Sequence, residues 1–265
     1  MASFSNTSKL PMRIFILALV VTAVTLLQSP WTVWAEPITQ KTLDLGKESN
    51  ITITGISSQD RSGGNLAVGD INNDGIDDLI LGAHLADPSS VGKSQAGITF
   101  VIFGPIHPGT LELSNEVDVI VNGIEVSDHS GRAVASGDVN NDGADDLIIG
   151  APQADAGNPL PNVGTTYVLF GPLSAGTLEL ETDSNFSISG INPHDMSGAA
   201  VGAGDINNDG ISDLIIGAPM ANTEASHAGQ TYVIFGPLET GIFEISSTVN
   251  LTINGNMAKQ NSGSA

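Results

Sequence analysis

The chain has 265 residues, no cysteine and a formal net charge of −21 at neutral pH. The absence of cysteine excludes disulfides and thiolate metal sites, and the negative charge disfavours binding to nucleic acid or to an anionic membrane, because both carry phosphate. With 31 glycines and only 8 Phe, 2 Trp and 2 Tyr, the composition indicates many short strands joined by tight turns.

Residues 1–35 have the pattern of a cleaved secretory signal peptide. Lys9 and Arg13 precede an apolar run from Ile14 to Leu27, and Val33-Trp34-Ala35 stands where a signal peptidase would cut. A membrane span needs about 20 residues, so this run is short for one, and an uncleaved anchor is the alternative interpretation. Cleavage would leave residues 36–265 with a charge of −23, secreted or at the cell surface, where calcium is abundant.

The rest of the chain is a repeat of 67 or 68 residues, measured between successive acidic loops. Each copy is bounded by a short alternating segment that ends in glycine, and period-two alternation predicts a half-buried strand. Eight residues later comes a Ser-Gly pair preceded by an aspartate that we expect to cap a turn. The alternating segments are 51–55, 119–123, 186–190 and 251–255, and the aspartates are Asp60, Asp128 and Asp195.

Two further strands are expected in each repeat, on either side of a long turn. A small, apolar segment leads into the acidic loop, and a buried strand such as Leu79–Ala83 leaves it. A later strand ends in Phe-Gly-Pro, as at Phe103-Gly104-Pro105. We therefore predict about four antiparallel strands in each repeat, with the acidic loop as the hairpin between the first and the second.

The acidic loops are nine residues long and occur three times, at 70–78, 138–146 and 205–213. Oxygen-bearing side chains stand at loop positions 1, 3, 5 and 9, glycine at position 6 can take a positive φ, and the main-chain carbonyl at position 7 is a further donor. Calcium accepts six to eight oxygens in a tolerant geometry, so we predict about three Ca²⁺ sites. The predicted ligands are Asp70, Asn72, Asp74, Ile76 and Asp78; Asp138, Asn140, Asp142, Ala144 and Asp146; and Asp205, Asn207, Asp209, Ile211 and Asp213.

Other interpretations of these loops are weaker. An EF-hand needs a bidentate Glu at position 12 and flanking helices, whereas position 12 is Leu81, Ile149 or Ile216 and the flanks are rich in glycine and β-branched residues. Magnesium would require a smaller octahedron and more water. A single loop could be a solvated hairpin turn, but three copies in register, each crowding three or four carboxylates into nine residues, favour a counter-ion.

The predicted fold class is all-β. A four-stranded unit of this size cannot bury both of its faces alone, and such sheets stacked around an axis make a β-propeller. A linear β-solenoid is the alternative, although solenoid coils are usually shorter than this repeat. We place the three complete blades at about 56–123, 124–190 and 191–255, and an incomplete fourth at 256–265.

The order Gly-Asp, acidic loop, Asp-Leu, Gly-Ala-Pro and Tyr-Val-x-Phe-Gly resembles the FG-GAP repeats of integrin α-subunit β-propellers. Related repeats occur in bacterial secreted proteins and in glycosylphosphatidylinositol-specific phospholipase D. The resemblance covers residues 51–265 and implies calcium at positions 1, 3, 5 and 9 of each acidic loop, on one face of the propeller. It also implies cell adhesion or protein–protein interaction as the function.

The chain departs from that family in two respects. The first repeat has His84 where the others have proline. Closed propellers generally need four to eight blades, so three complete repeats suggest a truncated product, or open arcs that self-associate through exposed blade edges.

No catalytic constellation is evident. His84, His107, His129, His194 and His227 lack paired metal-ligand spacing, and no Gly-x-Ser-x-Gly elbow occurs. Asn50, Asn185 and Asn250 begin glycosylation sequons, which recur at one repeat position. We expect a secreted, non-enzymatic interaction module with an extracellular protein partner, and as the alternative the propeller portion of a secreted hydrolase with catalysis elsewhere.

Overall fold

The computed structural model describes residues 50–88, 92–155, 161–223 and 225–264. All of them belong to one compact unit, Leu45–Ala265. The predicted signal peptide at 1–35 lies outside the described residues. Within the described ranges, no helix is long and apolar enough to cross a membrane.

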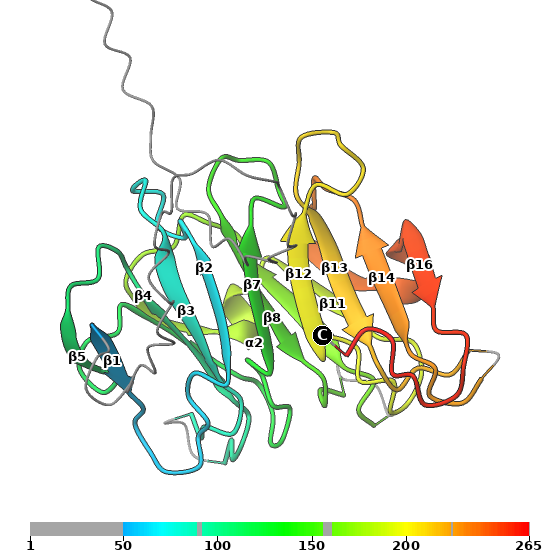
Figure 1. Ribbon diagram of the computed structural model, residues 1–265, viewed down its shortest axis with the longest axis horizontal. Coiled ribbons are helices and arrows are strands. Elements are labelled where there is room, and N and C mark those ends of the chain that lie inside the picture. Colours follow the sequence, from blue (N-terminus) through cyan, green and yellow to red (C-terminus); the bar gives the residue numbers. More distant parts are fainter. Residues whose placement is uncertain (1–49, 89–91, 156–160, 224, 265) are drawn as a thin grey trace, which may run out of the picture. The chain divides into compact units, whose positions relative to one another are not determined.

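The unit contains three large sheets, each with four antiparallel strands from one repeat, seen in cyan, green and yellow to red in Figure 1. We call them blades 1, 2 and 3. The sequence prediction of an all-β, propeller-like fold is confirmed. Blade 1 contains β2 (Asn65–Gly69), β3 (Asp78–Ala83), β4 (Ile98–Ile102) and β6 (Val119–Asn122); blade 2 contains β7 (Ala133–Gly137), β8 (Asp146–Ala151), β9 (Thr165–Leu169) and β11 (Phe186–Ser189); blade 3 contains β12 (Ala200–Gly204), β13 (Asp213–Ala218), β14 (Gln230–Ile234) and β16 (Leu251–Asn254).

Blades 1 and 2 each hold a fifth strand that the sequence prediction missed. β10 (Gly176–Glu179) pairs in parallel with β6, and β15 (Gly241–Glu244) pairs in parallel with β11. Both strands come from the following repeat, and each continues into a four-residue helix, α2 (Leu180–Asp183) or α3 (Ile245–Thr248). β5 (Gly109–Glu112) pairs in the same parallel way with β1 (Ile51–Thr54), in a two-stranded sheet.

The glycine that opens each parallel strand explains why the pairing occurs there. Gly176 has φ of 154° and Gly241 of 158°, in a region that other residues avoid. Their backbone N–H groups donate to Asp118 O and Asn185 O, just before β6 and β11, at 2.8 and 2.9 Å. These bonds set the register of the fifth strand.

Apolar side chains fill the spaces between neighbouring blades. Every residue of β8 and β9 is buried. One cluster joins Ile80 and Val101 of blade 1 to Val134 and Leu147 of blade 2. A second joins blades 2 and 3 in the same way. Burial of an Ile, Leu or Val side chain stabilises the fold by about 1.5–3 kcal/mol, so these seams hold the blades together.

Close backbone contact completes each seam. A Cβ added at Gly82, Gly150 or Gly217 would overlap the carbonyl oxygen of the Ser-Gly turn in the next repeat. Only glycine permits this approach, which explains the glycine in each Gly-Ala-His or Gly-Ala-Pro segment.

The turn before each Ser-Gly pair is capped as the sequence indicated. The Oδ2 atoms of Asp60, Asp128 and Asp195 accept hydrogen bonds from the backbone N–H three residues earlier, at 3.1, 3.0 and 3.2 Å.

Candidate metal-binding loops

The three acidic loops connect the first and second strands of the three blades, so all of them lie at the same end of the strands (Figure 1). In each, the asparagine at position 4 and the glycine at position 6 have positive φ, as at Asn73 (59°) and Gly75 (89°). Asparagine tolerates this conformation better than most residues and glycine adopts it freely. The pair turns the chain back on itself.

Hydrogen bonds within the first loop gather the side chains of positions 1, 3 and 5. Asp74 N donates to Asp70 Oδ1 and to Asn72 Oδ1, both at 2.9 Å. Gly75 N donates to Asp70 Oδ2 at 2.8 Å, and Ile76 N donates to Asp74 Oδ1 at 2.9 Å. Two carboxylates and one amide oxygen therefore converge on one short stretch of backbone.

The second and third loops repeat this pattern. Asp142 N donates to Asp138 Oδ1 at 3.0 Å and to Asn140 Oδ1 at 2.9 Å. Asp209 N donates to Asp205 Oδ1 at 3.1 Å and to Asn207 Oδ1 at 2.8 Å. The three sites therefore have the same internal geometry.

The aspartate at position 9 has a different place. Asp78, Asp146 and Asp213 are fully buried. In the second loop, Asp146 Oδ2 accepts from Val139 N at 2.8 Å and Asn140 N at 3.2 Å, and its Oδ1 accepts from Gly171 N at 2.9 Å. This side chain ties the loop to the Phe-Gly-Pro segment of its own blade, a role that the sequence interpretation missed.

The oxygen donors fit a hard cation. Positions 1, 3 and 5 supply two carboxylates and an amide oxygen, which are ligands that calcium prefers. The described residues contain no group of three or more His, Cys, Asp or Glu side chains arranged to hold a metal. Each loop gathers two such side chains and completes the set with asparagine. Whether positions 7 and 9 also contribute stays a prediction.

Burial and crowding perturb the position-9 carboxyl groups. Burial raises the pKa of Asp146 to about 7, three backbone N–H bonds oppose the change, and the nearby Asp142 adds to it. The pKa of Asp78 is raised for the same reasons, with Asp74 as the neighbouring charge. The negative charges of each loop thus act on one another at short range.

Neighbouring loops are also joined across the blade seams. Asp145, at position 8 of the second loop, accepts a hydrogen bond at Oδ2 from Asp70 N at 3.1 Å. Its own N–H donates to Asp70 O at 3.3 Å, and Ser212 N donates to Asp138 O at 3.2 Å. The first residue of each of the first two loops is therefore held by the following loop.

Three segments of the chain, 62–102, 130–169 and 197–234, match the family model of the FG-GAP repeat. Each segment runs from a Ser-Gly turn through an acidic loop to the strand that precedes Phe-Gly-Pro. The chain carries three FG-GAP repeats.

Two kinds of curated protein resemble this FG-GAP chain. Human phosphatidylinositol-glycan-specific phospholipase D is 34% identical over 164 residues, which cover 61% of the chain and 19% of that protein. Integrin alpha pat-2 of Caenorhabditis elegans is 29% identical over 196 residues, covering 67% and 14%, and mouse integrin alpha-IIb is 31% identical over 123 residues, covering 45% and 11%. The chain thus spans a fifth or less of these proteins.

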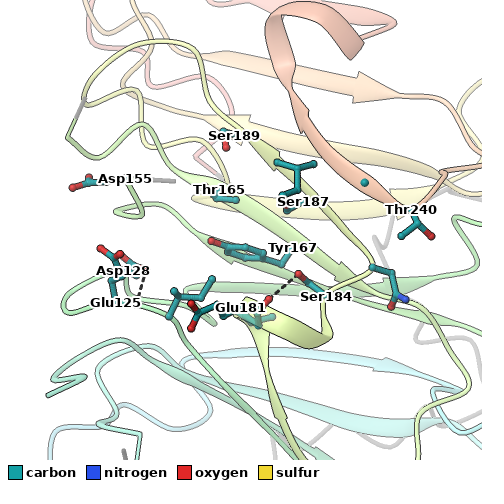
Figure 2. A pocket seen from close by; sticks show the side chains of 15 residues that line it. Glu125, Asp128, Asp155, Thr165, Tyr167, Glu181, Ser184, Ser187, Ser189 and Thr240 are labelled. Carbon is teal, nitrogen blue, oxygen red and sulfur yellow. Dashed lines mark hydrogen bonds between the residues drawn. The ribbon is translucent and has the colours of Figure 1, made fainter. Parts of the chain in front are cut away.

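The FG-GAP blades also form an open cavity of about 370 Å³ (Figure 2). None of its lining residues belongs to an acidic loop. Its polar lining includes Asp128, Glu125 and Asp155, together with hydroxyls from β9 and β11 such as Thr165 and Ser187. Burial raises the pKa of Asp128 to about 6, and the charges of Glu125 and Asp155 add to that shift. No Lys or Arg is among the described residues that line it.

The corresponding cavity beside blade 1 has apolar side chains at positions where the blade 2 cavity has hydroxyl-bearing side chains. It measures about 410 Å³ and is lined by Ile98, Phe100 and Ile120, where blade 2 has Thr165, Tyr167 and Ser187. The repeats therefore share a scaffold, and their cavity linings differ.

Proposed function

We propose that this FG-GAP protein is a secreted, non-enzymatic β-propeller module, stabilised by calcium, that mediates cell adhesion or another protein–protein interaction. The observation that carries the proposal is the threefold repetition of one oxygen-donor arrangement at one end of the blades. The integrin relatives support an extracellular interaction role.

The loop residues would act as follows. Positions 1, 3 and 5 would hold the ion, with Asp70, Asn72 and Asp74 in the first loop. Calcium supplies positive charge that offsets the repulsion among these carboxylates. The position-9 aspartate fixes each loop to its blade. Contacts such as the hydrogen bond from Asp70 N to Asp145 then couple the conformation of one loop to that of its neighbour. The remaining loops and the rim would then be presented rigidly to a partner.

Thermal unfolding with calcium and with chelator tests the metal assignment. Calcium that binds only the folded chain increases the free energy of unfolding by about 2.7 kcal/mol per site when its concentration is 100 times Kd. The melting temperature therefore rises. We expect calorimetry to count about three sites, following the three loops. Magnesium at equal concentration should stabilise the chain much less.

The triple variant Asp74→Ala, Asp142→Ala and Asp209→Ala should abolish the calcium effect. Asp77→Asn is the matched control, because it also removes an exposed loop carboxylate and stands at position 8, outside the predicted ligand set. Unchanged calcium stoichiometry in the triple variant would rule out the loops as the metal sites.

An alternative is that the chain is the propeller portion of a secreted hydrolase with catalysis elsewhere. The 34% identity to phosphatidylinositol-glycan-specific phospholipase D favours it. Incubation of the chain with a glycosylphosphatidylinositol-anchored reporter tests the premise that both proposals share, which is that the chain itself is not catalytic. We expect no release of the reporter by the chain alone, and release would show that the chain is itself catalytic.

A further inference from the structure

Two histidines far apart in the sequence meet at the seam between blades 1 and 2. His84 follows β3, and His129 lies in the turn that leads to β7. Their rings pack edge to face, with centroids 5.9 Å apart and planes at 73°. The turn is fixed against blade 1 because His129 N donates to Gln95 O at 3.3 Å and Ser130 N to Ala96 O at 2.9 Å.

Each ring leaves one nitrogen buried without a hydrogen-bond partner. These atoms are His84 Nδ1 and His129 Nε2. The His84 side chain is only 6% exposed, so water does not reach it freely. A buried polar atom without a partner is costly, and such atoms in a native structure point to a ligand or an ordered water.

The charges of both arginines of the described residues act on this pair. Arg132 and Arg61 lie close enough to both rings for their charges to lower the pKa values of His84 and His129. Both arginines are exposed, and neither guanidinium forms an ion pair or hydrogen bond with another described residue. We call these four residues the seam cluster.

The charge of the seam cluster selects the kind of ligand. A divalent cation would be repelled by two guanidinium groups, although neutral imidazoles can bind metals. An anion would be attracted, and a neutral imidazole can place its proton on the unpartnered nitrogen and donate it. The distant acidic loops oppose an anion only weakly, because charges farther apart than about 8 Å are screened at physiological salt.

The cluster belongs to one seam only. The second and third repeats have Pro152 and Pro219 at the position of His84, and the third repeat has Met196 and Ala199 at the positions of His129 and Arg132. The shared fold of the repeats therefore does not require these side chains.

We propose that the seam cluster binds an oxyanion, which could be a carboxylate of a partner or a sulfate or phosphate group. Arg61 and Arg132 supply the charge, and His84 Nδ1 and His129 Nε2 supply N–H donors at the seam. The site lies at the opposite end of the blades from the acidic loops, because β3 begins at the last residue of the loop and ends at Ala83, directly before His84.

Histidine side-chain NMR of the chain, with sodium sulfate, phosphate or acetate added at constant ionic strength, tests the proposal. We expect saturable shifts of the His84 and His129 ring signals and none at His107. Stronger binding of acetate would indicate a carboxylate ligand, whereas stronger binding of sulfate or phosphate would indicate an ester group. No saturable shift with any of the three anions would overturn the proposal, as would shifts with zinc alone.

Variants taken from sister repeats keep the fold while they remove the site. Arg132→Ala introduces the residue of the third repeat. It should weaken anion binding about tenfold, because loss of one hydrogen bond to a charged group raises the dissociation constant by about that factor. Lys259→Ser is the matched control, because it removes one positive charge elsewhere and introduces the residue of the second repeat, Ser127. Equal weakening by both variants would show a general charge effect and overturn the site.

Discussion

His84 shows how one substitution in a repeat changes the chemistry of a seam. Its sister repeats have proline at this position, and the sequence marks the change only as a departure from the repeat pattern. The structure places the side chain 6% exposed, against a second histidine. Linear spacing could not reveal this pair, because the two histidines are 45 positions apart in the chain.

The stability of the chain should depend on pH through His84. Burial, and then the charges of Arg132, His129 and Arg61, lower the pKa of His84 from its usual 6.5 to about 4. Between these values the unfolded chain binds a proton at His84 and the folded chain does not, so stability falls as the pH falls from about 6.5 to about 4. The loss is up to about 3 kcal/mol.

The variant His84→Pro should lose less stability than the wild type over the same pH range. Urea unfolding at several pH values measures the difference. Asp128 has the opposite sign, because its pKa is raised to about 6 and acidification below that value favours the folded state. That contribution is common to both proteins and cancels in the comparison. Parallel pH profiles would contradict the assignment to His84.

At the scale of the element, each acidic loop gathers oxygen donors at three positions and anchors itself to its blade at a fourth, and the sequence alone could not separate these two roles. Positions 1, 3 and 5 have side chains gathered by the loop itself, whereas the position-9 aspartate is buried and holds the loop to its blade. All four positions carry oxygen in the same pattern, so spacing alone assigns them the same role. The hydrogen bond to the Phe-Gly-Pro glycine is a tertiary contact, and its sequence signal is the recurrence of that glycine.

Asp146→Ala should therefore destabilise the chain even without calcium. It leaves Val139 N, Asn140 N and Gly171 N without their acceptor; the first bond is buried and the other two are partly buried. Because a buried unsatisfied group costs about 1–3 kcal/mol, we expect a loss of about 1–3 kcal/mol from Val139 N and a smaller addition from the other two groups. Asp142→Ala is the control, since this side chain is exposed, and should cost about 1 kcal/mol or less. Equal losses in urea unfolding with chelator present would refute the structural role of position 9.

The blade seams give a second comparison between elements. In Gly150→Ala the new Cβ would overlap Gly198 O, and overpacking of this kind costs about 1–3 kcal/mol. Gly204→Ala is the control, because nothing lies within 4 Å of its added Cβ and its φ is not in the left-handed region. It should change the free energy of unfolding little, or raise it by about 0.4–1 kcal/mol through the unfolded state.

At the scale of the whole molecule, charge opposes folding. The formal net charge is −21, and self-repulsion destabilises a compact chain. Raising NaCl from about 10 to 150 mM shortens the screening length from about 30 to 8 Å and should raise the melting temperature in the presence of chelator. Calcium at equal ionic strength should raise it further. A melting temperature that falls with NaCl would exclude self-repulsion as an important term.

The sequence predicts the architecture of the repeats well because their signals are local. Alternation, Gly-rich turns and the acidic loops identify the strands, and the threefold recurrence identifies the blades. The fifth strands were missed because Gly176–Glu179 has no partner within its own repeat. The contact of Asp145 with Asp70 was missed because it depends on how two blades meet.

Because the parallel strands β10 and β15 each pair with a strand of the preceding repeat, the boundaries of the sequence repeats and the boundaries of the sheets fall at different residues. Each sequence repeat ends with the fourth strand of its sheet, whereas the fifth strand of that sheet comes from the next repeat along the chain. The unit that duplicates is therefore not the unit that folds, and every blade with a fifth strand is the joint product of two neighbouring repeats. A shuffled chain assembled from whole repeats would preserve each loop and yet give its blades an edge strand from a different neighbour.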